Sequence, residues 1–410
     1  MRVSPFAALR PQPALAARVA AVPYDVVNTE EAKRLAEGEP LSFLHVSRAE
    51  IDLPPGTDPY SAAVYQRAEA NLRALEREAL LRESAPAVYI YQQQTTLLGH
   101  RVTQTSLVAC CHVEEYESGV IKRHEKTRRD KEDDRTRHVL TTRTHTGPVF
   151  LLYRDRPSIT QLMELEMAGA PLYDFVAVDG VQHRVWRCSN PEPYRAEFAA
   201  VEAAYVADGH HRAASAARAA AKLRAENARH AGNEEYNWFL VALFPASQLT
   251  ILPYHRVVKD LNGLSKVALL GKLREIGSLE KTNEPSPHAP GSFGIYLDHE
   301  WYRLTLPSAG IDQQDPVRAL DYSLLEQRVL TPVLGIGDIR TDQRIDFVGG
   351  IRGTGELEKR VDSGRDAIAF AMHPTSIEQL LAVADAGQIM PPKSTWFEPK
   401  LRSGLLIHTF

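Results

Sequence analysis

The stretch Ala204-Tyr-Val-Ala-Asp-Gly-His-His-Arg212 joins a predicted strand to a predicted helix. Tyr205 to Ala207 form a short apolar run, which is typical of the end of a buried strand. Asp208 and Gly209 favour a tight turn. The chain then continues from Arg212 to Lys222 in a run rich in alanine, the strongest helix former. We therefore expect a strand, a glycine turn and a helix in direct succession.

The start of such a helix can bind an anion. Its first backbone N–H groups have no partner within the helix, and the helix dipole is positive there. His210, His211 and Arg212 add side-chain donors, and arginine can bind a phosphate group through two N–H groups. The same residues also suit an ordinary surface turn, so spacing alone leaves both interpretations open. Zinc is disfavoured, because adjacent histidines point apart and no His-x-x-x-His spacing is present.

The composition is that of an ordinary soluble globular protein. The 410 residues predict two or three domains, with 44% hydrophobic and 24% charged residues. The formal net charge is -4, whereas general nucleic-acid binding requires a basic surface. We therefore expect no nucleic-acid partner, although a local basic pocket for a small anion remains compatible with this charge.

The sequence also indicates a cytoplasmic location. The three cysteines, Cys110, Cys111 and Cys188, form no Cys-x-x-Cys pair, which is typical of a reduced protein without disulfide bonds or zinc modules. The first residues are interrupted by prolines and arginines and lack a signal-peptide core. No apolar run approaches the length needed to span a membrane. We expect no membrane partner, and either a monomer or a homo-oligomer.

Helices and strands are mixed along the chain, in three sections covering residues 1–105, 106–260 and 261–410. Apolar periodicity and turn signals support these assignments. We expect helices over Tyr60–Leu81, Ile159–Met167, Pro191–Ala204, Ser265–Ile276, Asp321–Val333 and Ser376–Ala386. We expect strands over Ala87–Gln92, Val102–Val113, 146–153, Tyr173–Phe175, His183–Arg187, Trp238–Phe244, Ser292–Leu297 and Asp366–Met372. The first two should pair through the loop Leu97-Leu98-Gly99, and Asp179-Gly180 should form a hairpin turn. Asn28 should cap the start of a helix.

A highly charged run of mixed sign extends from Val120 to His138. One interpretation is a solvated helix, with ion pairs four residues apart such as Glu125–Arg129 and Asp134–His138. The early part has a second interpretation, because His124 and Glu125 follow a predicted strand end, where side chains are often presented to a cleft. The acidic cluster Glu132–Asp134 receives no role.

A phosphate bound at Asp208–Arg212 would need a base for an attacking hydroxyl and a counter-charge for the leaving group. Glu125 is a candidate base, since a carboxylate beside basic residues stays ionised. Asp208 either caps the following helix or holds a Mg²⁺ ion that bridges phosphoryl oxygens.

Two other polar groups allow either a structural or a functional interpretation. His255 and Arg256 adjoin an apolar strand edge, as surface side chains or as substrate ligands. Lys393, Ser394 and Thr395 form a compact donor group suited to a phosphate or an amino-acid carboxylate, or else an exposed tail. The familiar phosphate-binding loop, dinucleotide-binding and protein-kinase motifs do not occur.

Together these motifs resemble the free serine kinases of the ParB/sulfiredoxin-like fold. Asp208-Gly-His-His-Arg212 resembles their phosphate-binding turn, His124-Glu125 looks like their catalytic pair, and Pro392-Lys-Ser-Thr395 is similar to a segment that closes over their site. Such enzymes transfer a phosphoryl group to free L-serine and give O-phosphoserine. The resemblance implies catalytic roles for His124, Glu125 and Asp208, with Asp208 also a Mg²⁺ ligand. It implies phosphate binding by Lys126, Gly209, His210, His211 and Arg212, and substrate binding by His255, Arg256, Lys393, Ser394 and Thr395.

The chain is most similar to the larger bacterial branch of that group, which implies pyrophosphate as the donor, whereas the smaller archaeal enzymes use ADP. The interval from Glu125 to Asp208 exceeds theirs, which implies an insertion. The expected fold is α+β, or mixed α/β, with a ParB/sulfiredoxin-like core over 106–260, an N-terminal α/β section over 1–105 and a C-terminal α/β domain over 261–410 that closes over the site.

Two other functions remain open. One is a kinase or phosphatase for another small hydroxyl compound, such as a polyol. The other is a non-catalytic ParB-like regulator that binds a nucleotide or nucleic acid. The net charge of -4 and the lack of a helix-turn-helix pattern count against the regulator.

Overall fold

The computed structural model describes residues 1–309 and 311–410, which form two compact units. Unit 1 contains residues 1–123, 127–249 and 399–410, and unit 2 contains 124–126 and 250–398. The chain therefore passes between the units at four points. This division differs from the three sections expected from sequence, because strands of the first two sections join one sheet.

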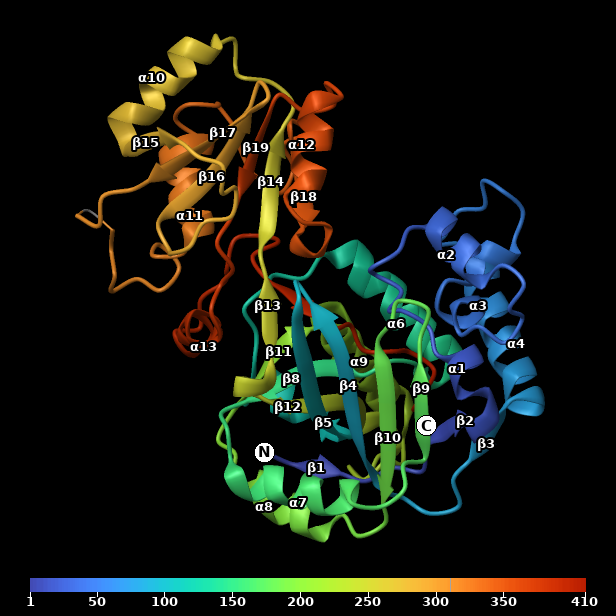
Figure 1. Ribbon diagram of the computed structural model, residues 1–410. Helices are drawn as coiled ribbons and strands as arrows, with labels where there is room; N and C mark the ends of the chain where they lie inside the picture. Colours follow the sequence, from blue (N-terminus) through green and yellow to red (C-terminus); the bar gives the residue numbers. More distant parts are fainter. Residues whose placement is uncertain (310) are drawn as a thin grey trace. The chain divides into compact units, whose positions relative to one another are not determined.

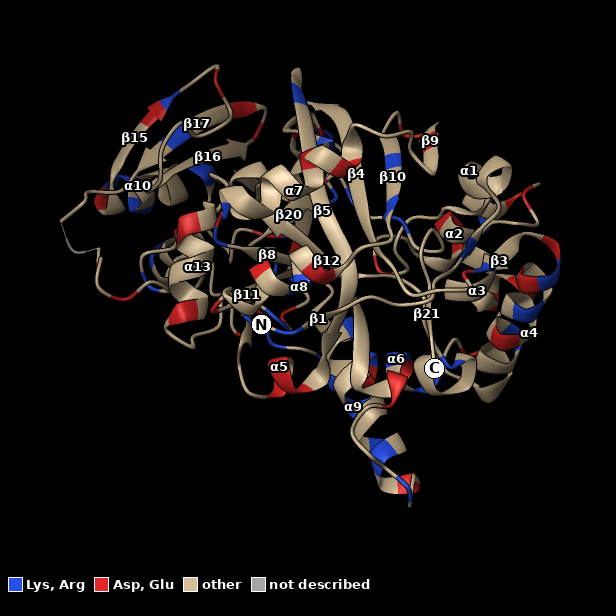
Figure 2. Cartoon of the chain, turned by 90° about the horizontal axis from the view of Figure 1, so that it is seen from below, with Lys and Arg blue, Asp and Glu red and all other residues tan. Residues whose placement is uncertain are grey.

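Unit 1 is built on a nine-stranded sheet (Figure 1). Its strand order is β6-β11-β8-β12-β5-β4-β10-β9, with β1 also paired to β5. The inner strands β8 and β12 contain no charged residue and are almost wholly buried, whereas Figure 2 shows both acidic and basic residues on a helix such as α4 (Ala62–Glu78). The strands are β1 Val3–Ser4, β4 Val88–Leu97, β5 His100–His112, β6 Ile121–Lys122, β8 Val149–Tyr153, β9 Tyr173–Val176, β10 Gln182–Cys188, β11 Ala204–Asp208 and β12 Trp238–Pro245.

The predicted hairpins of this sheet are confirmed. β4 and β5 pair antiparallel from Tyr89 with Val108 to Leu97 with His100, and the turn passes through Leu98 and Gly99. β9 and β10 also pair antiparallel, around the predicted Asp179-Gly180 turn. Two smaller pairs complete unit 1: β2 Leu9–Pro11 with β3 Leu80–Arg82, and β7 Thr144–His145 with β21 His408–Thr409.

Helices pack on this sheet through apolar side chains. Residues of α7, α8 and α9 share one hydrophobic core with the sheet, while α2, α3 and α4 enclose a second core. The predicted helix start at Asn28 is confirmed, because its side chain and that of Glu31 form a reciprocal capping box. The helices are α1 Ala16–Val19, α2 Thr29–Ala36, α3 Leu44–Ser47, α4 Ala62–Glu78, α5 Val113–Glu117, α6 Arg129–Thr142, α7 Pro157–Met167, α8 Glu192–Ala199 and α9 His210–Glu226.

Two sequence expectations need correction in unit 1. The predicted helix Pro191–Ala204 is shorter, since α8 ends at Ala199 and Ala204 begins β11. The charged run does form a helix, α6, but that helix is not simply solvated. Asp134 is buried and accepts a hydrogen bond from the Tyr65 hydroxyl at 2.9 Å, while buried His138 contacts the Val46 carbonyl.

Unit 2 is a six-stranded antiparallel sheet with its own hydrophobic core. The order of its strands is β15-β17-β16-β19-β14-β18. β13 and β20 form a separate two-stranded sheet. The strands are β13 Thr250–Leu252, β14 Tyr254–Val258, β15 Ser278–Lys281, β16 Ser292–Leu297, β17 Glu300–Thr305, β18 Ile345–Gly349, β19 Ile368–Ala371 and β20 Trp396–Glu398. The helices are α10 Lys266–Ile276, α11 Asp321–Leu325, α12 Gly355–Asp362 and α13 Ile377–Asp385.

The α+β class is confirmed by this mixture of helices and sheets, whereas the ParB/sulfiredoxin-like core stays a prediction. The predicted helix Asp321–Val333 is realised as α11 followed by a π-helical segment, Glu326–Leu330. Among the described residues, none of the helices has both the length and the apolar character that crossing a membrane requires.

Candidate active site

The predicted strand, turn and helix at Asp208–Arg212 are confirmed. β11 ends at Asp208, Gly209 adopts a left-handed conformation with φ of 90°, and α9 begins at His210. Glycine is required here for two reasons. Its φ is costly for other residues, and a Cβ atom would lie 2.9 Å from the Arg212 guanidinium carbon. Gly209 supplies no capping side chain to the helix.

Asp208 is held by nitrogen donors on both of its carboxylate oxygens. Oδ1 accepts the Gly209 N–H at 2.7 Å, and Oδ2 accepts from Lys400 Nζ at 2.9 Å. Burial opposes ionisation, but the charges of Lys400 and Arg212 outweigh it and hold the pKa of Asp208 well below its ordinary value. These contacts make Asp208 an ion-pair partner that fixes the turn. The capping interpretation is wrong, because Gly209 and not Asp208 is the residue at the N-cap of α9. A Mg²⁺ ion on Asp208 stays a prediction.

Lys400 was missed by sequence reasoning. It follows the Pro392–Thr395 motif along the chain, but its partner Asp208 is 192 residues away. A lysine near the end of a chain carries no local signal of such a contact. The structure therefore adds one positive charge to the turn that the sequence motif does not contain.

The two histidines of the turn are uncharged. Burial lowers the pKa of His210 to about 3, so its imidazole is neutral at physiological pH. His211 accepts the backbone N–H of Arg128 on Nε2 at 3.0 Å, which requires that nitrogen to be unprotonated. The histidines can therefore serve as hydrogen-bonding groups, while positive charge at the turn comes from Lys400 and Arg212.

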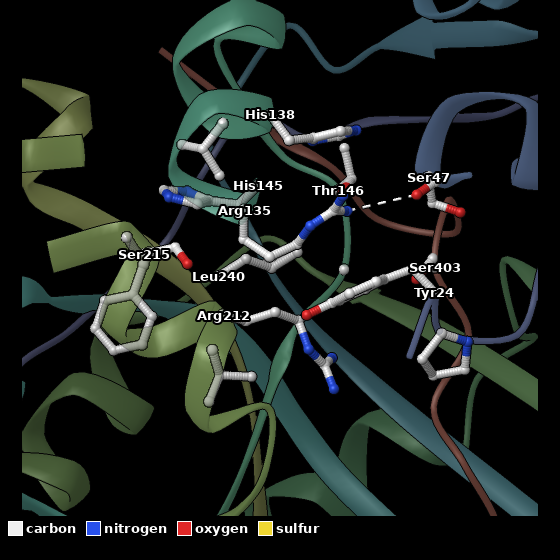
Figure 3. A pocket seen from close by; sticks show the side chains of 16 residues that line it. Tyr24, Ser47, Arg135, His138, His145, Thr146, Arg212, Ser215, Leu240 and Ser403 are labelled. Atoms are coloured by element: carbon white, nitrogen blue, oxygen red, sulfur yellow. Dashed lines mark hydrogen bonds between the residues drawn. The ribbon is translucent and has the colours of Figure 1, made fainter. Parts of the chain in front are cut away.

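Arg212 lies beneath the turn. Its Nη1 donates to the Pro148 carbonyl, and its Nη2 lies 3.6 Å from Asp208 and 4.0 Å from Asp25. It also lines a small cavity with a volume of about 30 Å³. In Figure 3 the Tyr24 side chain lies between those of Arg135 and Arg212. Part of the Arg212 side chain is thus used to fix the turn itself.

The His124–Lys126 segment is fastened within unit 2. The His124 carbonyl accepts the Met390 N–H at 2.8 Å, and His124 Nε2 lies 3.4 Å from the Thr395 hydroxyl. His124 is buried, Glu125 is half-buried and Lys126 is exposed. Two motifs separated by 271 residues in sequence therefore meet here.

The acidic cluster after this segment joins α6 to α9 within unit 1. Glu132 accepts from the Thr127 hydroxyl and, at 3.1 Å, from Arg218 on α9. Arg218 also pairs with Asp133. These contacts fix the chain immediately after Lys126, and they give the cluster the structural role that sequence reasoning left unassigned.

His255 and Arg256 do not fit the substrate-binding role expected from sequence. Both are buried inside unit 2, with 3% and 1% of their surface exposed. His255 Nδ1 accepts the Met372 N–H at 3.1 Å, and Arg256 donates to backbone carbonyls. The surface interpretation is also wrong, because β14 runs between β18 and β19 in the sheet.

The three tail residues have different surroundings. Lys393 is exposed and adopts a φ of 58°, with its ammonium group 5.6 Å from the centre of the Tyr254 ring. Ser394 is buried and donates to the Pro391 carbonyl at 2.7 Å, so its hydroxyl is already used. Thr395 contacts His124, as described above. Lys393 is therefore the tail residue best exposed to a ligand.

Solved structures with some likeness to this chain include three proteins at low identity. The free serine kinase in complex with AMP is 12% identical and covers 73% of this chain and 91% of its own, with a TM-score of 0.36. A conserved hypothetical protein from Pyrococcus furiosus is 11% identical, with 73% and 94% covered and a TM-score of 0.35. SbnI from Staphylococcus aureus, truncated at its C-terminus, is 12% identical, with 73% and 87% covered and a TM-score of 0.37. These TM-scores are too low to carry an argument.

No curated protein matches the sequence. One protein family does: the family described as "Protein of unknown function (DUF1015)" matches residues 3–323, which is more than half of the chain. The chain therefore belongs to the DUF1015 family.

Proposed function

We propose that this protein is a small-molecule phosphotransferase that phosphorylates the hydroxyl of free L-serine, with pyrophosphate as its donor. The proposal rests on the motifs His124-Glu125 and Asp208–Arg212 and on one hydrogen bond that links their surroundings. That bond runs from the Arg128 N–H to His211, inside unit 1. It ties the chain just after Glu125 to the turn that would bind phosphate.

Chain length limits how far Glu125 can lie from the turn. Glu125 precedes Arg128 by three residues, and three residues span at most about 11 Å. Because Arg128 contacts His211, the backbone of Glu125 is restricted to the neighbourhood of the turn by covalent geometry alone. A carboxylate within this range can reach the hydroxyl of a serine molecule that attacks a phosphate bound at Gly209.

The turn supplies the groups that phosphoryl transfer requires. Backbone N–H groups at the start of α9 and the charge of Lys400 favour phosphate oxygens, and His210 and His211 can add neutral hydrogen bonds. Lys126 is exposed and supplies a further cation next to Glu125 in the sequence. Such fixed donors stabilise the charge that spreads over the transferring group.

The proposed step is an in-line displacement. Glu125 takes the hydroxyl proton of serine while the serine oxygen forms a bond to one phosphorus atom of pyrophosphate. The bond from that phosphorus to the bridging oxygen breaks, and inorganic phosphate leaves with the electron pair. A Mg²⁺ ion held by Asp208 would neutralise part of the charge on the phosphoryl oxygens.

The direct test supplies L-serine with pyrophosphate, ADP or ATP in separate reactions and measures O-phosphoserine by ³¹P NMR and mass spectrometry. We expect product with pyrophosphate. Product with ADP alone would keep the kinase and change the donor. A panel of polyols and other small alcohols, run with the same donors, tests the alternative acceptor. If no donor and no acceptor give a phosphorylated product, the proposal fails.

A further inference from the structure

Arg256 has an unusual environment for a charged side chain. Its guanidinium group is buried in unit 2, and no ion pair to it is found among residues 1–309 and 311–410. Instead it lies over two aromatic rings, 4.4 Å from the centre of Tyr322 and 4.8 Å from that of Phe347. A buried charge is costly unless its hydrogen bonds are satisfied, so its partners indicate why it is kept.

Those partners are backbone carbonyls, and two of the three belong to one distant segment. Nη1 donates to Lys393 O at 2.9 Å and to Tyr254 O at 2.6 Å, and Nη2 donates to Pro392 O at 3.0 Å. The planar guanidinium thus fixes two successive carbonyls of the segment 390–395. A lysine ammonium would not reproduce this fork.

The segment 390–395 is bent at the place where Arg256 holds it. Lys393 has a φ of 58°, a conformation that is costly for residues other than glycine. Ser394 closes the bend through its hydroxyl to Pro391, and its carbonyl accepts from the Thr375 hydroxyl at 2.8 Å. The segment then continues into β20, which pairs with β13. A bend fixed at this many points persists only because its surroundings impose it.

The same segment holds His124 from both of its ends. At residue 390 a backbone N–H binds the His124 carbonyl, and at Thr395 a hydroxyl contacts the His124 ring. His124 is the direct neighbour of Glu125 in sequence. The contacts therefore form one continuous series from Arg256, through the bent segment and His124, to the residue before the proposed base.

We propose that Arg256 is a positioning residue for Glu125, and that it acts through the segment 390–395 without touching the substrate. This inference rests on the proposed function, because it assumes that Glu125 is the base. A misplacement of about 1 Å can cost about 100-fold in rate. Loss of the two carbonyl contacts should therefore lower kcat and leave donor binding to the turn of unit 1 unchanged.

The test compares Arg256→Met and Arg256→Lys with a matched control, Arg274→Met, at an exposed position of α10 in the same unit. We expect kcat for phosphoserine formation to fall about 100-fold in R256M, less in R256K and not at all in R274M. The dissociation constant for pyrophosphate, measured by calorimetry, should stay within about twofold, because the donor turn is unaltered.

Hydrogen exchange provides a readout that does not depend on activity. The Met390 amide, which binds the His124 carbonyl, should exchange faster in R256M and R256K than in the wild-type protein, while amides of α9 exchange at unchanged rates. Thr395→Val, which removes the hydroxyl near His124 and leaves Arg256 intact, provides a milder second variant. We expect it to lower kcat about tenfold with no change in the Met390 amide.

The outcomes separate this inference from the proposed function. If the wild-type protein phosphorylates serine and a folded R256M keeps full kcat, the positioning role is wrong. An equal loss of kcat and of pyrophosphate binding would also overturn it, since this indicates general damage to the fold. If the wild-type protein has no kinase activity, the proposed function fails, and unchanged exchange at Met390 would separately refute the link from Arg256 to His124.

Discussion

The stretches Ala204–Arg212 and Pro253–Arg256 look alike in sequence but differ in structure. Each places a histidine and an arginine after apolar residues. In the first, the chain leaves the sheet at Gly209 and its polar groups surround the start of a helix. In the second, β14 continues through His255 and Arg256 between two other strands. A histidine–arginine pair thus lies at the start of a helix where the backbone leaves the sheet, and inside the core where the strand continues.

We propose that the first region takes part in catalysis and that the second has a structural role. The largest expected effect comes from a substitution of the proposed base. Glu125→Gln should lower turnover about 10²- to 10⁴-fold, because the amide cannot accept the serine proton. Pyrophosphate binding should change little. Steady-state kinetics and calorimetry measure the two effects, with Glu202→Gln, at an exposed position of unit 1, as the control. An active E125Q would remove Glu125 from the base role.

The pH dependence of stability tests the structural role of the buried pair, His255 and Arg256. Burial and then the Arg256 charge lower the pKa of His255 to about 4, below its ordinary value of 6.5. Between pH 6.5 and 4, His255 is therefore protonated in the unfolded chain but not in the folded protein. Stability should fall by about 3 kcal/mol as pH decreases through this window.

This fall in stability should be smaller in His255→Asn, whose amide oxygen can still accept the Met372 N–H. Urea unfolding of both proteins at pH 7, 6, 5 and 4 isolates the contribution of His255 from that of the other histidines. Parallel curves for the two proteins would show that His255 is accessible to water, which would contradict a purely structural role.

Lys400 tests the charge balance at the turn. Lys400→Met should destabilise unit 1 by about 1–3 kcal/mol at pH 7, because it leaves the Asp208 carboxylate partly buried with weaker compensation. Because the pKa of Asp208 is lowered in the folded protein, its ionisation stabilises the fold at pH values above the ordinary carboxyl pKa. This stabilisation is lost as pH falls from the ordinary pKa down through the lowered one. The two proteins should therefore converge in stability at acid pH. Lys222→Met, at an exposed site, serves as the control.

The smallest expected effect comes from a pair of glycine substitutions. Gly209→Ala should destabilise by about 1–2 kcal/mol and weaken phosphate binding, because of its positive φ and the nearby Arg212 guanidinium. Gly271→Ala, within α10 and with open space around its Cβ position, should stabilise by about 0.5–1 kcal/mol. Denaturant melts measure both. Equal effects at the two sites would contradict the strained geometry assigned to the turn.

Local structure could largely be predicted from the sequence. The turn at Asp208-Gly209, the hairpin at Leu98-Gly99 and the helix start at Asn28 depend on neighbouring residues, and all three are confirmed. The α+β class follows from the same local patterns. The division into units could not be predicted this way, because it depends on which distant strands pair.

The candidate site was only partly accessible to sequence reasoning. The motifs at His124-Glu125 and Asp208–Arg212 carry local signals, whereas the contact of Lys400 with Asp208 depends on tertiary folding. The burial of Arg256 was missed because burial of a polar strand residue depends on its neighbours in the sheet. The type of a polar residue therefore says little about its exposure unless the pairing of its strand is also known.

The central claim is that Glu125 and the Asp208–Arg212 turn serve one reacting phosphoryl group. A crystal structure of the protein with bound O-phosphoserine tests it most directly. We predict that the phosphate lies against the backbone N–H groups that follow Gly209, with a Glu125 carboxylate oxygen about 2.6–3.2 Å from the serine Oγ atom. Phosphoserine bound elsewhere, or Glu125 directed into solvent and beyond hydrogen-bonding distance of that oxygen, would contradict the claim.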